Sequence, residues 1–258
     1  MITALMTDEL ARQRQGGVRS YISPSRLGLW LRCPLAFRFR YVDGVKSPTT
    51  PSLFIGKMCH RGLETFYRHR QLGVTLEAED VAQRMIDGWD EAIAEEGMQF
   101  DAESDETEAK LKTVDLVAAY LACAPEDEPR PLAVEATMEE PLVDPVTGED
   151  FEIPLLGIVD LVLNGPEGAL IIDFKTAARS GTPAEIAHEI QLSSYSYLLR
   201  RLDGRKEAGL QIRSLIKTKT PKIEFHEYAA RTDAHFPPAT HGCKPADGSR
   251  QGVDDFHL

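Results

Sequence analysis

Two aspartates and a lysine stand in apolar stretches of this sequence, where charged side chains are unusual. Asp160 ends the segment 157–160 (GIVD), and Asp173 and Lys175 interrupt the segment 171–175 (IIDFK). Carboxylate oxygens are the ligands that a hard cation such as Mg²⁺ prefers. A lysine beside such a cation can orient or deprotonate water and stabilise negative charge on a phosphate. The residue types therefore indicate metal-assisted hydrolysis.

The stretch between these segments brings the two carboxylates together. Residues 164–168 (NGPEG) are typical of a turn that joins two strands. A hairpin around this turn places Asp160 opposite Asp173, to within one residue of register, and puts Asp173 and Lys175 on one face. Facing carboxylates on a half-buried sheet repel each other, and a divalent cation removes that repulsion. The alternative is an ordinary ion pair of Asp173 with Lys175 at a strand end, with Asp160 facing a turn.

Five further polar residues have spacings or positions that fit a site. His60 and Glu64 lie four apart on one expected helix, and Gln191 and Tyr195 lie four apart on another. Glu135 is a charged residue inside the apolar segment 134–136. Each has a simpler explanation when taken alone. A lone helical histidine is more often structural or solvated, a Gln–Tyr pair is more often a surface contact, and edge strands often carry one charge.

Helical patterns fill the first half of the chain and strand patterns fill the second. Ser23 followed by Pro24 predicts a helix start, and this helix is expected to end near residues 43–44. The other expected helices are 56–71, 77–96, 106–123 and 183–202, and the expected strands are 132–143, 153–163, 169–174, 209–217 and 223–228. This order predicts an α/β fold in which helices flank a mixed central sheet, with a helical N-terminal portion.

The net charge of −12 over 258 residues is unevenly distributed. Residues 77–128 hold 17 acidic and 3 basic side chains, whereas residues 21–72 hold 9 basic and 2 acidic ones. Such asymmetry suggests separate faces, of which the basic one would meet phosphate; ordinary solvated helix faces are the alternative. We expect the acidic helices to point away from Asp160 and Asp173. The basic segment from Arg26 to Arg70 and the strand end Lys217–Lys222 are expected to flank these aspartates.

We expect one domain over residues 18–230, which includes the acidic helical segment 77–128. Residues 1–17 and 237–258 are expected to be poorly ordered tails. Residues 1–17 lack the apolar core of a signal peptide and no stretch is long enough to span a membrane, so we expect a cytoplasmic protein without a membrane partner. The cysteines form no Cys-x-x-Cys pair and are expected to be free thiols: Cys33, Cys59, Cys123 and Cys243.

Five motifs, in this order, resemble the PD-(D/E)XK nuclease superfamily and in particular its RecB-like branch. That branch includes the RecB/AddB-type nuclease domains of recombination helicase–nucleases and the CRISPR adaptation exonucleases. The motifs are an opening helix at 23–41, Gly-x-x-x-His-x-x-Leu-Glu at 56–64, Gly-x-x-Asp at 157–160, Asp-Phe-Lys-Thr at 173–176 where the family has Tyr for Phe, and Gln-x-x-x-Tyr at 191–195. The resemblance extends from residue 21 to about residue 199, which is most of the chain.

The resemblance implies a restriction-endonuclease-like fold and a metal-dependent DNA nuclease, with exonuclease as the expected mode. It implies a role in DNA repair, recombination, or defence or phage processing. DNA, either single-stranded or at duplex ends, is the implied substrate, and a helicase or another protein is a candidate partner. The implied ligands of Mg²⁺ or Mn²⁺ are His60, Asp160, Asp173 and the backbone carbonyl of Phe174.

The resemblance also implies roles around the metal. Lys175 would position the attacking water, and Glu135 would add a metal or water contact. Gln191 and Tyr195 would orient DNA or Lys175. Basic residues expected to contact phosphate without reading bases are Arg26, Arg32, Arg38, Arg40, Lys217 and Lys219.

Two departures from the family pattern limit what the resemblance implies. Some members of the branch hold an iron–sulfur cluster with one cysteine in the opening helix and three near the C-terminus. Cys33 matches the first position, but only Cys243 follows residue 209, so we expect no such cluster. The segment after Phe236 does not resemble the family's ending. One alternative function is a nuclease-like DNA-binding or adaptor subunit of a larger complex, without turnover. A second alternative is a structural adaptor whose acidic helices bind a basic partner.

Overall fold

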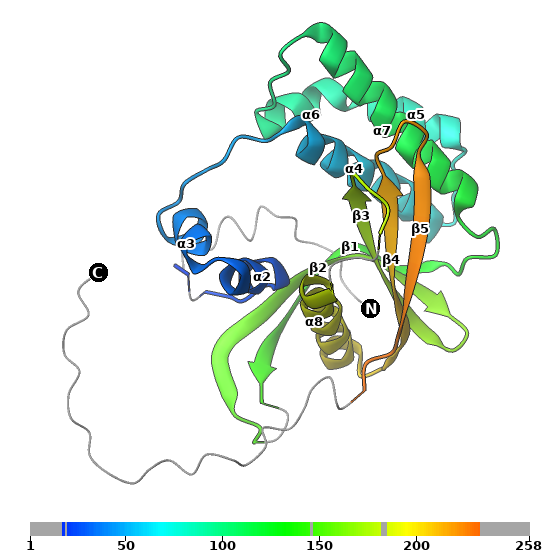
Figure 1. The fold of residues 1–258 in the computed structure, drawn as a ribbon. Helices are drawn as coiled ribbons and strands as arrows, with labels where there is room; N and C mark the ends of the chain where they lie inside the picture. Colours follow the sequence, from blue (N-terminus) through cyan, green and yellow to red (C-terminus); the bar gives the residue numbers. More distant parts are fainter. Residues whose placement is uncertain (1–16, 19, 145–146, 182–184, 233–258) are drawn as a thin grey trace.

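In the computed structural model, which describes residues 17–18, 20–144, 147–181 and 185–232, five strands form one mixed sheet (Figure 1). Their spatial order follows the sequence, and every neighbouring pair is antiparallel except β3 and β4, which are parallel. The chain must therefore cross one face of the sheet between β3 and β4. The strands are β1 (Pro131–Val143), β2 (Asp150–Gly165), β3 (Gly168–Ala177), β4 (Glu207–Ile216) and β5 (Lys222–Ala229).

The β2–β3 hairpin has the register that the sequence predicts. Leu161 pairs with Ile172, so the next position along the two strands brings Asp160 opposite Asp173. The hairpin closes where Gly165 pairs with Gly168, whose φ of 136° is open to glycine but strained for other residues. The tight turn thus fixes the relation between the two aspartates.

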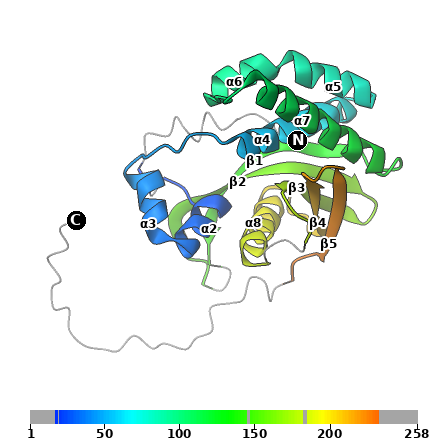
Figure 2. The ribbon, with the colours of Figure 1, turned by 45° about the horizontal axis from the view of Figure 1, so that its top comes forward.

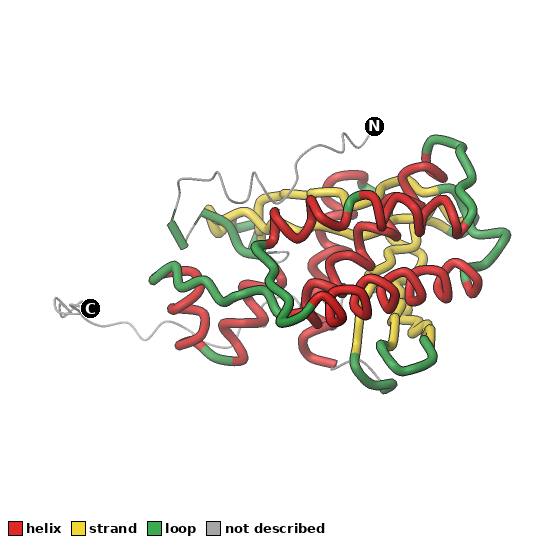
Figure 3. Tube along the Cα trace, turned by 90° about the horizontal axis from the view of Figure 1, so that it is seen from above, coloured by secondary structure: helices red, strands yellow, loops and turns green. Residues whose placement is uncertain are grey.

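A layer of helices covers one face of the sheet. Helix α4 lies nearest to the strands, and α5, α6 and α7 pack on it (Figure 2). Seen from above, helices lie in front of the strands (Figure 3). The apolar side chains of this layer share one buried cluster with β3, which includes Phe54, Leu63, Trp89, Leu116 and Ile172. The bounds are α4 (Pro51–Gln71), α5 (Ala78–Asp87), α6 (Trp89–Glu96) and α7 (Glu103–Cys123).

Helix α8 (Glu185–Asp203) makes the crossover from β3 to β4 on the other face. It buries Leu192, Tyr195 and Leu198 in a second apolar cluster against β2 and β4. The opening segment packs beside α8 rather than beside α4 (Figure 1). It consists of α2 (Pro24–Arg32), α3 (Pro34–Phe37) and a π-helical turn, η1 (Arg38–Val42).

Three of the differences between the expected and the observed helix boundaries have clear local reasons. The opening helix breaks at Cys33, which is extended because a residue before proline is disfavoured in the helical region. Helix α4 begins at Pro51 instead of residue 56, because the Thr50 side chain caps it by accepting from Leu53 N. The expected helix 77–96 divides at Gly88, which ends α5 and precedes α6.

The predicted α/β class is confirmed: a mixed sheet is flanked by helices, and the N-terminal portion is helical. The expected tails lie outside the described residues, apart from Gly17. Among the described residues, no helix is both long and apolar enough to cross a membrane.

Candidate active site

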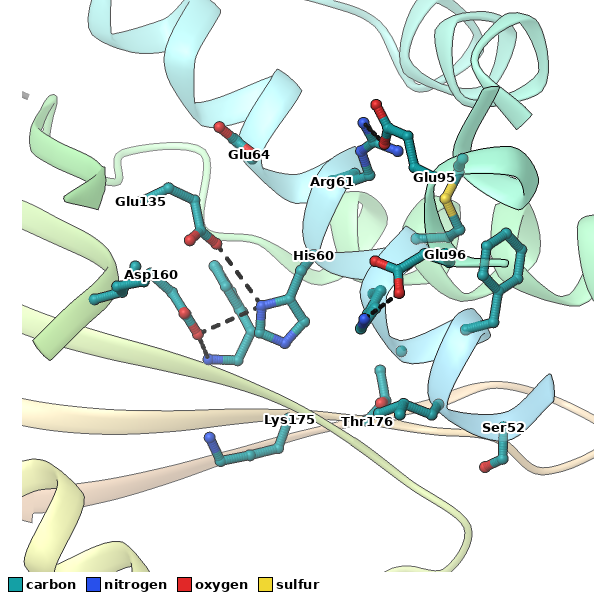
Figure 4. A pocket seen from close by; sticks show the side chains of 18 of the residues that line it. Ser52, His60, Arg61, Glu64, Glu95, Glu96, Glu135, Asp160, Lys175 and Thr176 are labelled. Carbon is teal, nitrogen blue, oxygen red and sulfur yellow. Dashed lines mark hydrogen bonds and ion pairs between the residues drawn. The ribbon is translucent and has the colours of Figure 1, made fainter. Parts of the chain in front are cut away.

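His60, Glu135 and Asp160 meet where helix α4 lies over strands β1 and β2 (Figure 4). His60 Nδ1 lies 3.8 Å from Glu135 Oε1 and 3.7 Å from Asp160 Oδ2. One ligand atom from each residue lies within 4.8 Å of the other two. In the described part of the chain, no other three His, Cys, Asp or Glu side chains come close enough to share a metal ion.

Glu135 reaches this group through an unusual backbone conformation. Its φ is 44°, in the left-handed region that residues other than glycine rarely adopt. The residues on either side of Glu135 pair regularly with β2, so Glu135 itself lies opposite Asp160. Its side chain lines the same cleft as Asp160. Strained backbone of this kind concentrates at functional sites, which favours a site role for Glu135 over that of an ordinary strand charge.

Asp173 and Lys175 form a second set, joined to helix α8. Asp173 is buried, and its Oδ2 lies 2.6 Å from Lys175 Nζ. Gln191 Nε2 donates to Asp173 Oδ1 at 2.8 Å and to Tyr195 Oη at 2.7 Å. Asp173 Oδ1 therefore accepts a hydrogen bond, whereas buried Oδ2 has the ion pair with Lys175 but accepts no hydrogen bond. Asp173 lies outside the three-residue group of His60. Lys175 links the two sets because its side chain lines the cleft with Asp160.

Phe174 lies between the two sets and supports Asp160. Its backbone N–H donates to Asp160 Oδ2 at 2.6 Å. Its ring is stacked on Tyr67, with centroids 5.9 Å apart, and is edge-on to Tyr120 at 5.4 Å. The core on the α4 side thus fixes the ring whose backbone bonds the Asp160 carboxylate.

A buried polar network holds these two tyrosines. Arg213 Nη1 lies 2.5 Å from Glu128 Oε1 and donates to Tyr120 Oη at 2.7 Å, while Tyr67 Oη donates to Glu128 Oε2 at 2.8 Å. Burial raises the pKa of Tyr120 to about 12 and that of Tyr67 well above its usual value, so both hydroxyls keep their protons. The network ties β4 to α4 and α7 and so positions Phe174.

The electrostatics of the site favour a positive charge among its carboxylates. Burial raises the pKa of Asp160, and repulsion from Glu135 adds to the rise, although His60 opposes it. Burial raises the pKa of Asp173 to about 6 even though Lys175 lowers it. Burial lowers the pKa of His60, but Asp160 and Glu135 outweigh burial and raise it to about 9. A divalent cation would supply this positive charge more fully than a proton on His60, so the donor set fits a metal.

A cleft of about 1140 Å³ opens beside this group. Its walls come from α4, α6, the strands β1 to β3, and residue 217 after β4. His60, Asp160 and Lys175 line it. Asp173, Gln191 and Tyr195 are not among its lining residues and are connected to it through the ion pair of Asp173 with Lys175. A substrate in the cleft would thus contact the His60 group and Lys175 together.

One turn of the acidic segment enters the cleft, contrary to our expectation. Glu95 and Glu96, in the last turn of α6, line it, so the prediction that the acidic helices point away from the site is wrong for this turn. The reason is apolar packing: α6 buries Trp89 and Ala92 in the same core as α4. Both glutamates are ion-paired with basic residues of α4, namely Arg61 at 3.0 Å and Lys57.

The first part of the expected basic segment Arg26–Arg70, from α2 to η1, does not flank the cleft, because it packs on α8 across the sheet from α4. Its second part, in α4, does line the cleft as expected, through Lys57, Arg61 and Arg68. Arg26 uses its guanidinium within the fold: Nη1 donates to the carbonyls of Val18 at 3.3 Å and Tyr21 at 3.0 Å, and the group lies 3.7 Å from the Tyr21 ring centroid. Arg38 lies 3.5 Å from Asp43. Phosphate contact by Arg26 would disrupt these internal bonds.

Of the six expected phosphate contacts, Lys217 is the one that lines the cleft. Its Nζ donates to the carbonyl of Ser52 at 3.0 Å and to its Oγ at 2.7 Å. Arg32, Arg40 and Lys219 are exposed elsewhere on the surface. Lys57 and Arg61 also line the cleft, three residues before and one after His60 on α4. They belong to the basic segment expected to flank the cleft but were not among the six individual phosphate contacts.

The described cysteines are free thiols, as expected. Cys33 Sγ accepts a hydrogen bond from Ala36 N at 3.4 Å and so caps α3. Cys59 is fully buried, and burial raises the pKa of its thiol to about 12. Cys243 lies outside the described residues, so the expectation about an iron–sulfur cluster stays a prediction.

Comparison with known proteins gives a family match. A family model described as the PD-(D/E)XK nuclease superfamily matches residues 21–245. A crystal structure from Eubacterium rectale, described provisionally as that of an exonuclease, aligns with a TM-score of 0.57 at 13% identity, covering 90% of this chain and 80% of that chain. The crystal structure of SSO0001 aligns with a TM-score of 0.33 at 14% identity over 81% of each chain, a similarity too weak for argument. No curated protein matches. At such identities, the first likeness demonstrates a shared fold alone.

Proposed function

This chain belongs to the PD-(D/E)XK nuclease superfamily, and we propose that it is a deoxyribonuclease that depends on a divalent metal ion. The observation that carries the proposal is the convergence of His60, Glu135 and Asp160 within 4.8 Å, with Lys175 lining the same cleft. Imidazole and carboxylate donors suit Mg²⁺ or Mn²⁺. The family supplies the reaction class, and the donor set supports the dependence on metal.

We assign the metal to His60, Glu135 and Asp160, with the backbone carbonyl of Phe174 as a further candidate. A bound Mg²⁺ or Mn²⁺ lowers the pKa of a water molecule and stabilises negative charge on a phosphoryl oxygen. Asp173, a ligand by family resemblance, would join this set only if its Oδ2 exchanged Lys175 for the ion. In the structure, Asp173 instead pairs with Lys175 and orients its ammonium group.

The other side chains hold and orient Lys175. Its ammonium group is positioned by Asp173 and is partly open to the cleft, where it would donate to the attacking water or to a phosphate oxygen. Gln191 fixes the Asp173 carboxylate, and Tyr195 fixes Gln191. The buried hydroxyl of Tyr195 keeps its proton, since burial raises its pKa well above the usual value.

Finer features of the function follow the family resemblance. We propose a RecB-like exonuclease that acts on single strands or duplex ends, in the cytoplasm, in DNA repair, recombination, or defence or phage processing. A helicase or another protein is a candidate partner. We also retain the domain 18–230 as the catalytic unit.

The proposal is tested with end-labelled single-stranded, duplex and circular DNA in Mg²⁺, Mn²⁺ or EDTA. We expect linear DNA to be cut with either metal and to stay intact in EDTA. Asp160→Asn and Lys175→Ala should each abolish cutting, because one removes a ligand charge and the other the cleft ammonium. Asp101→Asn and Lys206→Ala change the same residue types at exposed positions and should keep wild-type activity.

The outcomes separate the alternatives. Cleavage that persists in EDTA would overturn the dependence on metal, and cleavage of circular DNA would overturn the exonuclease mode. Folded protein that binds DNA but cuts none of these substrates with either metal would favour the adaptor alternative. The acidic turn of α6 in the cleft is the observation that favours this alternative.

A further inference from the structure

Basic residues form a stripe along the cleft side of helix α4. Lys57, Arg61 and Arg68 follow one another at intervals of four and seven residues, and all three line the cleft. These intervals keep side chains on one face of a helix. His60 lies within this stripe, so the basic side chains flank the proposed metal group on its own helix.

The two basic residues nearest to His60 are held by the last turn of α6. Lys57 pairs with Glu96. Arg61 Nη2 lies 3.0 Å from Glu95 Oε2 (Figure 4). The Arg61 and Glu95 side chains are each about half exposed, at 47% and 52%. The Lys57 and Glu96 side chains are 41% and 25% exposed. Pairs that reach solvent in this way stabilise a fold little, so another anion can displace the Glu95 carboxylate readily and the less exposed Glu96 carboxylate less so.

The pairs are not needed to hold α6 in place. Trp89 is 1% exposed and Ala92 is 0% exposed, and both belong to the core that also contains Phe54 of α4. The Trp89 and Phe54 rings are in edge contact, with centroids 5.1 Å apart. Apolar packing therefore anchors the helix. Glu95 and Glu96 can leave their basic partners without loosening α6.

We propose that Lys57 and Arg61 form a phosphate-binding subsite for the nucleic-acid strand beside the metal group, and that Glu95 and Glu96 occupy this subsite in the free protein. This inference rests on the proposed function. The Arg61 guanidinium and the Lys57 ammonium suit phosphate oxygens, and a carboxylate resembles a phosphate in charge and in hydrogen-bonding capacity. Binding of the strand then exchanges one anion for another at each basic side chain.

This exchange makes a prediction about salt. A phosphate contact normally releases a condensed cation, and each contact adds roughly 0.7 to the slope of log affinity against log salt for a single strand. When a phosphate displaces a glutamate, the freed carboxylate gathers cations again, so the two contacts add little to the slope. Removing the carboxylates should restore up to about 1.4 in slope for two contacts.

The test measures binding of a labelled single-stranded oligonucleotide in EDTA at several salt concentrations. We expect Glu95→Gln/Glu96→Gln to bind more tightly at low salt, by roughly 3- to 10-fold, and to show the steeper slope. Glu108→Gln/Asp115→Asn removes two exposed charges from α7, where neither residue lines the cleft, and should keep the wild-type slope. Far-ultraviolet circular dichroism checks that each variant is folded.

A second pair of variants identifies the basic residues. Lys57→Ala/Arg61→Ala should change the slope little in the otherwise wild-type chain. When the same two changes are combined with Glu95→Gln/Glu96→Gln, they should remove the gain in affinity and slope. An unchanged slope in Glu95→Gln/Glu96→Gln, or a gain that survives loss of Lys57 and Arg61, overturns the subsite. Because binding is measured in EDTA, these results are independent of cleavage. Slopes that shift as expected in a protein that never cuts DNA would refute the nuclease proposal alone.

Discussion

Glu135→Gln tests whether the strained glutamate is a metal ligand. In the metal-free protein the change removes two opposing interactions. Glu135 and Asp160 repel each other by about 3.5 kcal/mol if their oxygens are 4.8 Å apart and the effective dielectric constant is about 20. A protonated His60, at 3.8 Å, attracts Glu135 by about 4 kcal/mol under the same assumption. Because these terms nearly cancel, the free energy of unfolding without metal should change by about 1 kcal/mol or less.

The metal-bound protein should respond very differently. A ligand at 100 times its Kd raises the free energy of unfolding by about 2.7 kcal/mol. Changing the groups that merely orient metal ligands weakens binding about 10- to 100-fold. Removing the charge of a ligand itself should therefore weaken it by about 100-fold, which reduces the stabilisation to about 0.4 kcal/mol at the same metal concentration.

Urea unfolding with Mn²⁺ and with EDTA measures both quantities. Glu167→Gln is the matched control, because it removes the same charge from the exposed β2–β3 turn and should keep the full metal response. A Glu135→Gln protein that gains as much stability from Mn²⁺ as the wild type would refute the assignment. A loss of several kcal/mol in EDTA would instead indicate that Glu135 has mainly a structural role.

Three other predictions concern the framework of the site. Gly157→Ala should lower the free energy of unfolding by about 1–3 kcal/mol in urea, because a Cβ there would lie 2.7 Å from Leu198 Cδ1. Glu207→Gln should cost about 1.5–3 kcal/mol at pH 7. Burial raises the pKa of Glu207, but hydrogen bonds from Arg200 and neighbouring groups lower it overall. The Glu207 carboxylate therefore stabilises the fold above its unfolded-state pKa of 4.5, and this stabilisation is lost as pH falls through its lower folded-state pKa. The deficit of the variant should therefore shrink as the pH falls below 4.5 in the same assay; a constant deficit would contradict this cause. Buried Cys59 should stay unlabelled by a thiol reagent in the native protein, as peptide mass mapping can check; rapid native labelling would contradict its burial.

The fold was largely predictable because local signals and the global arrangement agree. The turn at 164–168 set the register of β2 and β3, and alternating or continuous apolar segments marked the strands. The errors lay at helix ends, where a single residue can determine where a helix begins or ends. Pro34 breaks the opening helix at the residue before it, and Thr50 with Pro51 starts α4 one turn early.

The site was predictable in its membership but less so in its grouping. His60 and Asp160 could be placed together only through family resemblance, since no local pattern joins residues so far apart. The role of Glu135 depends on a positive φ that its sequence neighbourhood does not signal. Asp173 as a metal ligand stays a prediction. Its orientation in the structure is set by Gln191, which donates to Oδ1, and by Lys175, which pairs with Oδ2.

The failure of the charge argument has a physical cause that bears on function. Counting charges along the chain treated residues 77–128 as one acidic face, yet helix packing is decided by apolar surface, and Trp89 brings the last turn of α6 to the cleft. Screening at physiological salt limits each charge to roughly 8 Å. Within that distance the cleft has basic and acidic side chains in pairs. The net charge of −12 should therefore slow the approach of DNA. Once DNA has reached the cleft, its binding depends instead on whether a phosphate can displace Glu95 from Arg61 and Glu96 from Lys57.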